Sequence, residues 1–153
     1  MVRSRERVSE YLTKSGAKYE LREFDESTKS SALAAQALAC SVAEIAKSVV
    51  FVGEKTAVVI ISGDKRVDGA KLANLMGTKL RIAEADEVRD RTGFPIGGVP
   101  PFPHGEGITV LVDSSLTRFA HVWAAAGTPN SVFGIETPDL LRLVGNKPID
   151  VAE

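Results

Sequence analysis

The sequence predicts one globular domain that mixes α-helices and β-strands, and three observations support this class. Of the 153 residues, 44% are hydrophobic and 25% are charged, as in a soluble domain that buries a core without disulfides. Strongly β-branched runs are interspersed with segments of helical spacing. No linker or internal repeat interrupts the chain, so residues 1–153 are expected to form a single domain.

The N-terminal segment predicts a helix followed by a strand. Val8, Tyr11 and Leu12 fall on one face of a charged segment that stops near Gly16, as in a short amphipathic helix. Apolar residues then alternate over 19–24, which favours a strand.

The next signals predict two helices and a hairpin. Residues 31–40 are rich in alanine and predict a helix, and Ser41 and Glu44 have the spacing of a capping box that starts a very short one. Residues 47–52 and 56–61 are β-branched runs separated by a short turn that begins with glycine. This pattern indicates two buried antiparallel strands.

The middle of the chain predicts short elements and then a long loop. Residues 68–76 have helical spacing and are followed by Gly77, 80–82 suggest a short strand, and 83–91 suggest another helix. Glycine and proline exclude regular structure over 93–107. Loops of this length in a compact domain are commonly functional or disordered. Four apolar residues within this loop argue against disorder, namely Phe94, Ile96, Val99 and Phe102.

The C-terminal part predicts three strands and a last helix. Residues 108–112 favour a strand, and 119–125 and 131–135 favour a final strand pair. Residues 137–140 place proline directly after a threonine N-cap, and the helix that they start is expected to end at Gly145.

Charge and cysteine content limit the function classes. The net charge of −1 provides no global positive field for nucleic acid, so any RNA contact must be local. The charged start of the chain lacks the apolar core of a signal peptide, and no apolar run has the length of a membrane helix. A single cysteine, Cys40, excludes an internal disulfide and fits a reducing compartment. We therefore expect a cytoplasmic protein without a membrane partner.

Common catalytic motifs are missing from the sequence. Residues 105–110 lack the third glycine of a dinucleotide fingerprint, and residues 63–71 have the wrong spacing for a phosphate loop. There is no G-x-S-x-G motif, and His104 and His121 are too far apart to suggest a metal site. Cys40 is better interpreted as a small buried hydrophobe than as a nucleophile. We expect neither a cofactor nor a metal.

Lys47 is the residue with two open interpretations. It shares a strand face with Val49 and Phe51, so its stem should pack against apolar groups. Residue type alone favours a cation near a helix end whose ammonium reaches water. The alternative is a lysine at the rim of a pocket that binds a phosphate or a developing negative charge.

The turn at residues 97–100, Gly-Gly-Val-Pro, is the feature that could face Lys47. Paired glycines allow close approach of the backbone to a ligand, and free N–H groups can bind an oxyanion. A tight turn required only by chain geometry explains the same residues equally well.

Several of these motifs together, in this order and spacing, resemble the YbaK/prolyl-tRNA synthetase-associated domain family. The likeness extends from about Tyr19 to Val151 and rests on the following segments: 38–48, the hairpin, 68–77, 97–100, 110–113, 126–127 and 137–140. The resemblance implies an α+β fold with a curved mixed sheet and flanking helices. It also implies a deacylase that acts in trans on mischarged tRNA, most often tRNA for proline that carries Cys or Ala.

The resemblance also implies roles for individual residues. Lys47 matches the family lysine that holds the phosphate of the terminal adenosine, and Gly97 and Gly98 match the loop that receives the aminoacyl ester. Lys47 and Gly98 are thus the expected catalytic residues. The expected substrate-binding residues are Ser48, Gly97, Val99, Pro100, Ala125 and Ser131. Backbone N–H groups would polarise the ester carbonyl while a water, or the substrate's own thiol, attacks. The expected partners are the 3′ acceptor end of mischarged tRNA and a prolyl-tRNA synthetase.

The sequence departs from the family at three places. Ala39 stands where relatives usually have glycine, and Ala125 begins a segment that replaces the Ser-Gly-Gly of some cysteine-clearing members. Ser131 lies near the histidine of some alanine-clearing members. These departures leave two alternatives open: a module that binds an aminoacyl-adenosine, tRNA or a synthetase without turnover, and a hydrolase of small esters.

Overall fold

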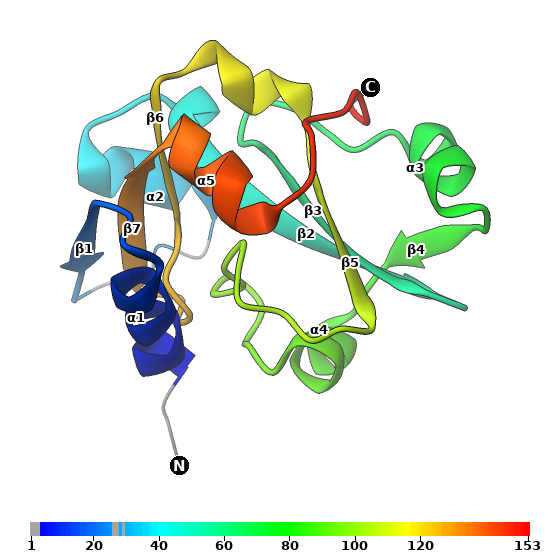
Figure 1. Ribbon diagram of the computed structural model, residues 1–153, viewed down its shortest axis with the longest axis horizontal. Helices are drawn as coiled ribbons and strands as arrows, with labels where there is room; N and C mark the ends of the chain where they lie inside the picture. Colours follow the sequence, from blue (N-terminus) through cyan, green and yellow to red (C-terminus); the bar gives the residue numbers. More distant parts are fainter. Residues whose placement is uncertain (1–3, 26–27, 29) are drawn as a thin grey trace.

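The computed structural model describes residues 4–25, 28 and 30–153 (Figure 1). Its helices are α1 (Ser4–Ser15), α2 (Ser31–Leu38), α3 (Gly69–Met76), α4 (Ala85–Thr92) and α5 (Thr137–Val144), with 3-10 turns at Val42–Glu44 and Ser114–Arg118. Its strands are β1 (Tyr19–Glu23), β2 (Ile45–Gly53), β3 (Thr56–Ser62), β4 (Leu80–Ile82), β5 (Ile108–Val112), β6 (His121–Ala125) and β7 (Ser131–Glu136). The expected α+β class is confirmed.

The seven strands of the described residues belong to one mixed, open sheet. Its order is β1-β7-β6-β2-β3-β5, and β4 pairs with the far end of β2. The β2–β3 hairpin is antiparallel, as the sequence predicts, whereas the β2–β6 and β3–β5 pairs are parallel. Both parallel pairs join strands that are distant in the sequence. Because β2 pairs with β6 on one side and with β3 on the other, it lies in the middle of the sheet.

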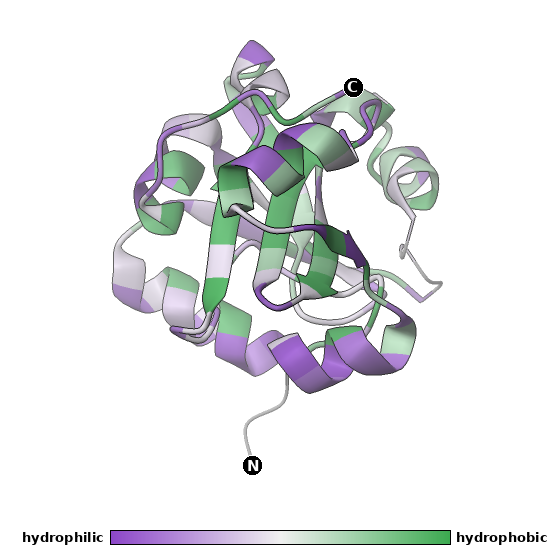
Figure 2. Cartoon of the chain, turned by 90° about the vertical axis from the view of Figure 1, so that its right-hand side faces the viewer, coloured by the Kyte–Doolittle hydropathy of each residue, from purple (hydrophilic) through white to green (hydrophobic). Residues whose placement is uncertain are grey.

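Helices cover both faces of the sheet. On one face, α1, α4 and α5 pack with the 93–107 loop against strand residues such as Val50 and Phe133. On the other face, α3 covers the β2–β3 hairpin and α2 packs on Ile45 and Trp123. Figure 2 shows hydrophobic strands inside a shell of helices with hydrophilic outer surfaces. No helix in the described ranges has both the length and the apolar character needed to cross a membrane.

The long loop is well packed, as its apolar residues predict. Phe94, Val99 and Phe102 are at most 5% exposed and belong to the main core. Ile96 differs, because it is 54% exposed. The loop is thus anchored by three side chains and presents the fourth to solvent.

Element boundaries shift by a few residues where local chemistry decides. The first core strand begins at Ile45 rather than at residue 47, so Lys47 lies inside it. β6 starts at His121 rather than at residue 119, because Phe119 closes the preceding 3-10 turn. The sequence pattern does not predict this turn. The second helix ends at Leu38, before Cys40, since Ala39 adopts a left-handed conformation with φ 54°.

Replacing Ala39 with glycine is expected to stabilise the protein by about 1 kcal/mol. The left-handed region costs an L-residue roughly 1–2 kcal/mol that glycine avoids, although glycine also loses more entropy on folding. This conformation is the one in which the glycine expected here from the resemblance would be favoured. Chemical denaturation of the A39G variant would measure the change, and a loss of stability would show that the helix end does not constrain this residue.

Candidate functional site

The edge of β2 is open between two neighbouring strands. On the side away from β3, pairing with β6 covers only Ile45 and Ala46, and pairing with β4 begins at Phe51. No strand in the described part of the chain pairs with that edge over residues 47–50. The sheet therefore splits along the middle of β2.

Ser48 directs its backbone polar groups into this gap. The N–H of Gly63 donates to the carbonyl of Ile45 at 2.8 Å, which shows that odd-numbered residues of β2 bond to β3. Even-numbered residues consequently face the open side, where the Val50 carbonyl accepts a hydrogen bond from Ala83 at 2.9 Å. The N–H and C=O of Ser48 lie between the two strand pairings and can meet a ligand.

A pocket of about 430 Å³ occupies the gap, a size typical of small-molecule sites. Residues 45–50 of β2 form one wall, and Ile96, Gly97 and Val99 of the long loop contribute another. Lys47 is the single charged residue among the described residues of the lining, which contain no histidine, aspartate or glutamate. The described walls thus offer neither a side-chain general base nor a nucleophile with a paired base.

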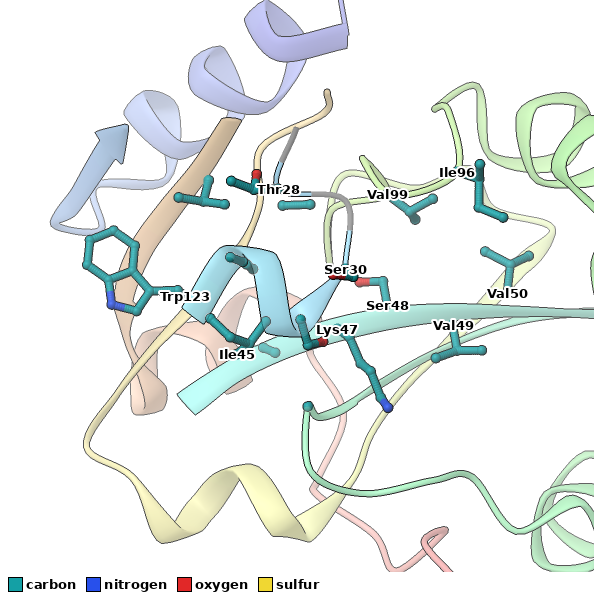
Figure 3. A pocket seen from close by; sticks show the side chains of 18 of the residues that line it. Thr28, Ser30, Ile45, Lys47, Ser48, Val49, Val50, Ile96, Val99 and Trp123 are labelled. Carbon is teal, nitrogen blue, oxygen red and sulfur yellow. The ribbon is translucent and has the colours of Figure 1, made fainter. Parts of the chain in front are cut away.

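The Ser48 side chain lines the pocket and lies on the same side of β2 as Val50 (Figure 3). Its Oγ is buried and has no hydrogen-bond partner within the described structure. Buried polar side-chain atoms nearly always have a partner, and leaving one unpaired costs stability. This hydroxyl is therefore suited to bind a group of an incoming ligand.

The Lys47 ammonium extends to the face of β2 opposite Ser48 and Val50 (Figure 3). This placement follows from strand alternation, since Val49 and Phe51 on the same face pack with α3. Partial burial lowers the pKa of Lys47 below its usual value, and the nearby Arg66 lowers this pKa further, whereas Asp64 opposes the shift. The structure brings Gly97 and Val99 into one pocket with Ser48. The Lys47 ammonium lies on the other face of β2 from the Ser48 side chain.

The glycine pair of the long loop has two separate structural roles. Residues 95–98 form a turn in which the N–H of Gly98 donates to the Pro95 carbonyl at 2.9 Å, and Gly97 has φ 81°. A Cβ on Gly98 would lie 2.8 Å from the carbonyl carbon of Thr128. Gly97 is thus required for the turn and Gly98 for close packing. The Gly98 N–H is already engaged, so Gly97 is the better donor toward the pocket.

The other predicted site residues divide into two groups. Ala125 lines the pocket, but Pro100 and Ser131 are absent from its described lining. The Pro100 carbonyl instead pairs with Nε2 of His104 at 2.8 Å, and the buried Ser131 hydroxyl lies 2.5 Å from that of Thr128. Pro100 and Ser131 therefore support the loops that border the pocket.

Sequence reasoning missed several lining residues near α2 and β6, among them Thr28, Ser30 and Trp123. Thr28 is tied to the β6–β7 loop, because its N–H and hydroxyl both donate to the Pro129 carbonyl. No local pattern marks these residues, since only the fold brings them to β2.

The expected packing role of Cys40 agrees with its surroundings. Its side chain packs on the edge of the small core between α2 and β6. Burial, followed by the nearby Glu44 carboxylate, raises the pKa of its thiol, which disfavours the reactive thiolate.

His104 lines a second cavity of about 410 Å³, formed with residues of α1, β5 and α5. Its Nε2 donates to the Pro100 carbonyl, while the buried Nδ1 has no partner in the described structure. Burial lowers the pKa of His104, the Pro100 hydrogen bond opposes this shift, and Arg7 adds to it. The neutral imidazole is therefore part of the packed fold.

We expect His104 to make stability depend on pH below neutrality. Its folded pKa lies below the ordinary value of about 6.5, so the unfolded chain binds the proton more readily. The free energy of unfolding keeps its full value above the ordinary histidine pKa of about 6.5. It falls as the pH is lowered below that pKa, by at most about 1.4 kcal/mol per pH unit. Urea titrations at several pH values should show that the free energy of unfolding depends less on pH in H104Q than in H121Q. Equal slopes would contradict this assignment.

Comparisons with known proteins identify the family of this chain. The family model described as "Aminoacyl-tRNA editing domain" matches residues 25–143. The chain belongs to the aminoacyl-tRNA editing domain family. The resemblance inferred from its motifs is thereby confirmed.

Individual relatives of this editing domain are of three kinds. An uncharacterized protein of Bacillus subtilis (strain 168), YwhH, is 34% identical over 149 residues, which cover 95% of each chain. A solved structure of a candidate trans-editing enzyme for prolyl tRNA synthetase superposes with a TM-score of 0.90 and 39% identity, covering 100% of this chain and 99% of the other. A proline–tRNA ligase of Lactobacillus delbrueckii subsp. bulgaricus is 30% identical over 92 residues, which cover 58% of this chain and only 16% of the ligase.

Proposed function

We propose that this editing domain is a deacylase that hydrolyses the ester of mischarged tRNA in trans, in the cytoplasm. The single observation that carries the proposal is the pocket at the open edge of β2, where Ser48 and Gly97 meet in a member of the editing family. The pocket would receive the aminoacylated 3′ end of the tRNA. Prolyl-tRNA synthetase would be the functional partner whose errors are removed.

The proposed reaction relies on position and hydrogen bonding. The Ser48 hydroxyl and the N–H groups of Ser48 and Gly97 would hold the ester and polarise its carbonyl. Water adds to that carbonyl, the ester C–O bond breaks, and the terminal ribose hydroxyl and the free amino acid leave. Because the described lining contains no general base, orientation must supply most of the rate enhancement.

The expected amino acids are small. Ala124, Ala125 and Val132 contribute apolar side chains to the lining of the pocket. We expect this lining to receive a small side chain such as that of alanine or cysteine. One methylene in an apolar pocket changes discrimination by about 1–3 kcal/mol. Alanine and cysteine differ by one small group, a thiol, so the preference between them should be modest.

The proposal is tested by deacylation assays with tRNA for proline carrying Cys, Ala, Ser or Pro. We expect hydrolysis of the Cys or Ala ester and protection of the correct Pro ester. Binding of the tRNA or of the synthetase without release of any amino acid would favour a non-catalytic module. Equal cleavage of free amino acid esters in the presence of competing tRNA would favour a small-ester hydrolase.

Ser48→Ala is expected to lower activity and to raise stability. The hydroxyl has no partner in the described free protein, so its removal should stabilise the fold by about 1 kcal/mol, whereas loss of one substrate hydrogen bond should reduce kcat/KM about tenfold. Denaturant titration and single-turnover assays measure the two effects. Ser131→Ala is the matched comparison, since it removes a buried hydroxyl that has a partner and should lower stability. Loss of stability in S48A would show that the hydroxyl serves the fold.

A further inference from the structure

The open edge of β2 presents both backbone groups of Ser48 to the pocket. Pairing with β6 ends at Ala46, and pairing with β4 begins at Phe51. Because odd-numbered residues of β2 bond to β3, the N–H and the carbonyl of Ser48 point away from β3. Among the described residues, no strand, loop or side chain forms a hydrogen bond with either group. One donor and one acceptor of the same residue are therefore free at the pocket wall.

An α-amino acid ester carries the two complementary groups. Its α-amino group, which is an ammonium at neutral pH, donates hydrogen bonds, and its ester carbonyl accepts them. In an antiparallel sheet, the two opposite residues of a hydrogen-bonded pair exchange both of their N–H···O bonds. A single aminoacyl group can therefore form such a pair with one strand residue.

The charges of the pocket indicate that an ammonium bound there needs a carbonyl as its acceptor. The described lining contains no aspartate or glutamate, so it has no carboxylate to pair with the ammonium. Lys47 would repel it, but the Lys47 ammonium lies on the opposite face of β2 from the Ser48 side chain. A buried donor without an acceptor costs binding energy. The Ser48 carbonyl is a free acceptor on this wall and meets that need.

We propose that the aminoacyl group binds as one residue of an added antiparallel strand. Its α-ammonium donates to the Ser48 carbonyl, and the Ser48 N–H donates to its ester carbonyl. This inference rests on the proposed function and makes the Ser48 carbonyl the group that selects an α-amino acid. An acyl ester without an amino group can form only one of the two bonds.

The same pairing determines where the side chain of the amino acid lies. Side chains of directly opposite residues lie on the same face of a sheet. The side chain of an L-amino acid therefore lies on the Ser48 face of β2, where Val50, Val99 and Ala124 line the pocket and belong to the main core. A D-amino acid held by the same two bonds directs its side chain to the Lys47 face instead. The pairing thus predicts a preference for L-amino acids.

The test uses three unhydrolysable ligands, the amides of 3′-amino-3′-deoxyadenosine with L-alanine, D-alanine and propionic acid. The propionyl ligand differs from the alanyl ligands only by the missing amino group. Calorimetry on the wild-type chain should show that the L-alanyl ligand binds at least about tenfold more tightly than the propionyl ligand, as expected for a hydrogen bond from a charged group. The D-alanyl ligand should also bind more weakly than the L-alanyl ligand.

Ser48→Ala is the matched variant, because it removes the hydroxyl and keeps both backbone groups. The ratio of the two affinities, L-alanyl over propionyl, should be the same in S48A as in the wild-type chain. NMR gives a direct readout of the bond, since the chemical shift of the Ser48 carbonyl carbon should change with the L-alanyl ligand and not with the propionyl ligand. The carbonyl carbons of Lys47 and Val49 are internal controls, because they face β3 and should change less.

The outcomes separate this inference from the proposed function. If the wild-type chain binds none of the three ligands, the proposed site itself fails. If it binds the L-alanyl and propionyl ligands equally, or if S48A removes the difference between them, the pocket stands and recognition by the Ser48 carbonyl is overturned. An unchanged Ser48 carbonyl carbon in the L-alanyl complex would overturn it as well. Equal or tighter binding of the D-alanyl ligand would overturn the strand-like pairing.

Discussion

Gly98→Ala should reduce deacylation by about a hundredfold, since small displacements of a positioned substrate can cost that much. The new Cβ would lie 2.8 Å from the carbonyl carbon and 2.9 Å from the Cα of Thr128, which are backbone atoms that cannot rotate away. The turn must therefore shift, and Gly97 and Val99 move with it out of the pocket wall. Overpacking of this kind should also cost about 1–3 kcal/mol of stability.

Gly105→Ala is the matched control for this prediction. Gly105 belongs to the same loop, a Cβ there would meet no atom within 4 Å, and its φ is not positive. We expect near wild-type activity and stability in G105A. Single-turnover rates and thermal unfolding of both variants provide the measurement, and full activity in G98A would show that the loop does not set the geometry of the pocket.

Lys47→Met should lower kcat/KM by about ten- to a hundredfold, the range expected when a hydrogen bond between charged groups is lost. Methionine keeps an apolar stem against Val49 while the positive charge is removed, so the fold should be preserved. If the lysine holds a phosphate, KM should rise and kcat should also fall, because the ester would be held less firmly.

The same Lys47 variant separates the two interpretations that the sequence left open. Arginine at this position should restore part of the lost activity, since it retains the charge. Lys55→Met serves as the control, because the Lys55 amine is bound to the Met76 carbonyl outside the pocket. Unchanged kinetics in K47M would leave Lys47 as a surface cation with a packed stem.

Local sequence patterns predict the elements of this fold well because their causes are local. The β-branched runs of the hairpin and the apolar residues Phe94, Val99 and Phe102 report burial directly. The parallel pairing of β2 with β6 depends on contacts between residues nearly eighty positions apart, such as Ile45 and Trp123. The open edge follows from this pairing, and so no local pattern could predict it.

The candidate site could be predicted only in part from the sequence. Ser48, Gly97 and Val99 were expected near one another from the resemblance, and they line one pocket. Strand alternation places the Lys47 ammonium and the Ser48 side chain on opposite faces of β2. Only the path of the 93–107 loop shows which of these faces the loop covers. The requirement for Gly98 arises from the backbone of Thr128, a contact that the sequence does not reveal.

Binding of an unhydrolysable aminoacyl-adenosine, followed by amide NMR, tests most directly whether the split in the sheet is the editing site. We expect the largest shifts at the amides of Ser48, Val50 and Gly97, which border the open edge. Shifts centred on the second cavity near His104, or no binding at millimolar ligand, would contradict this assignment.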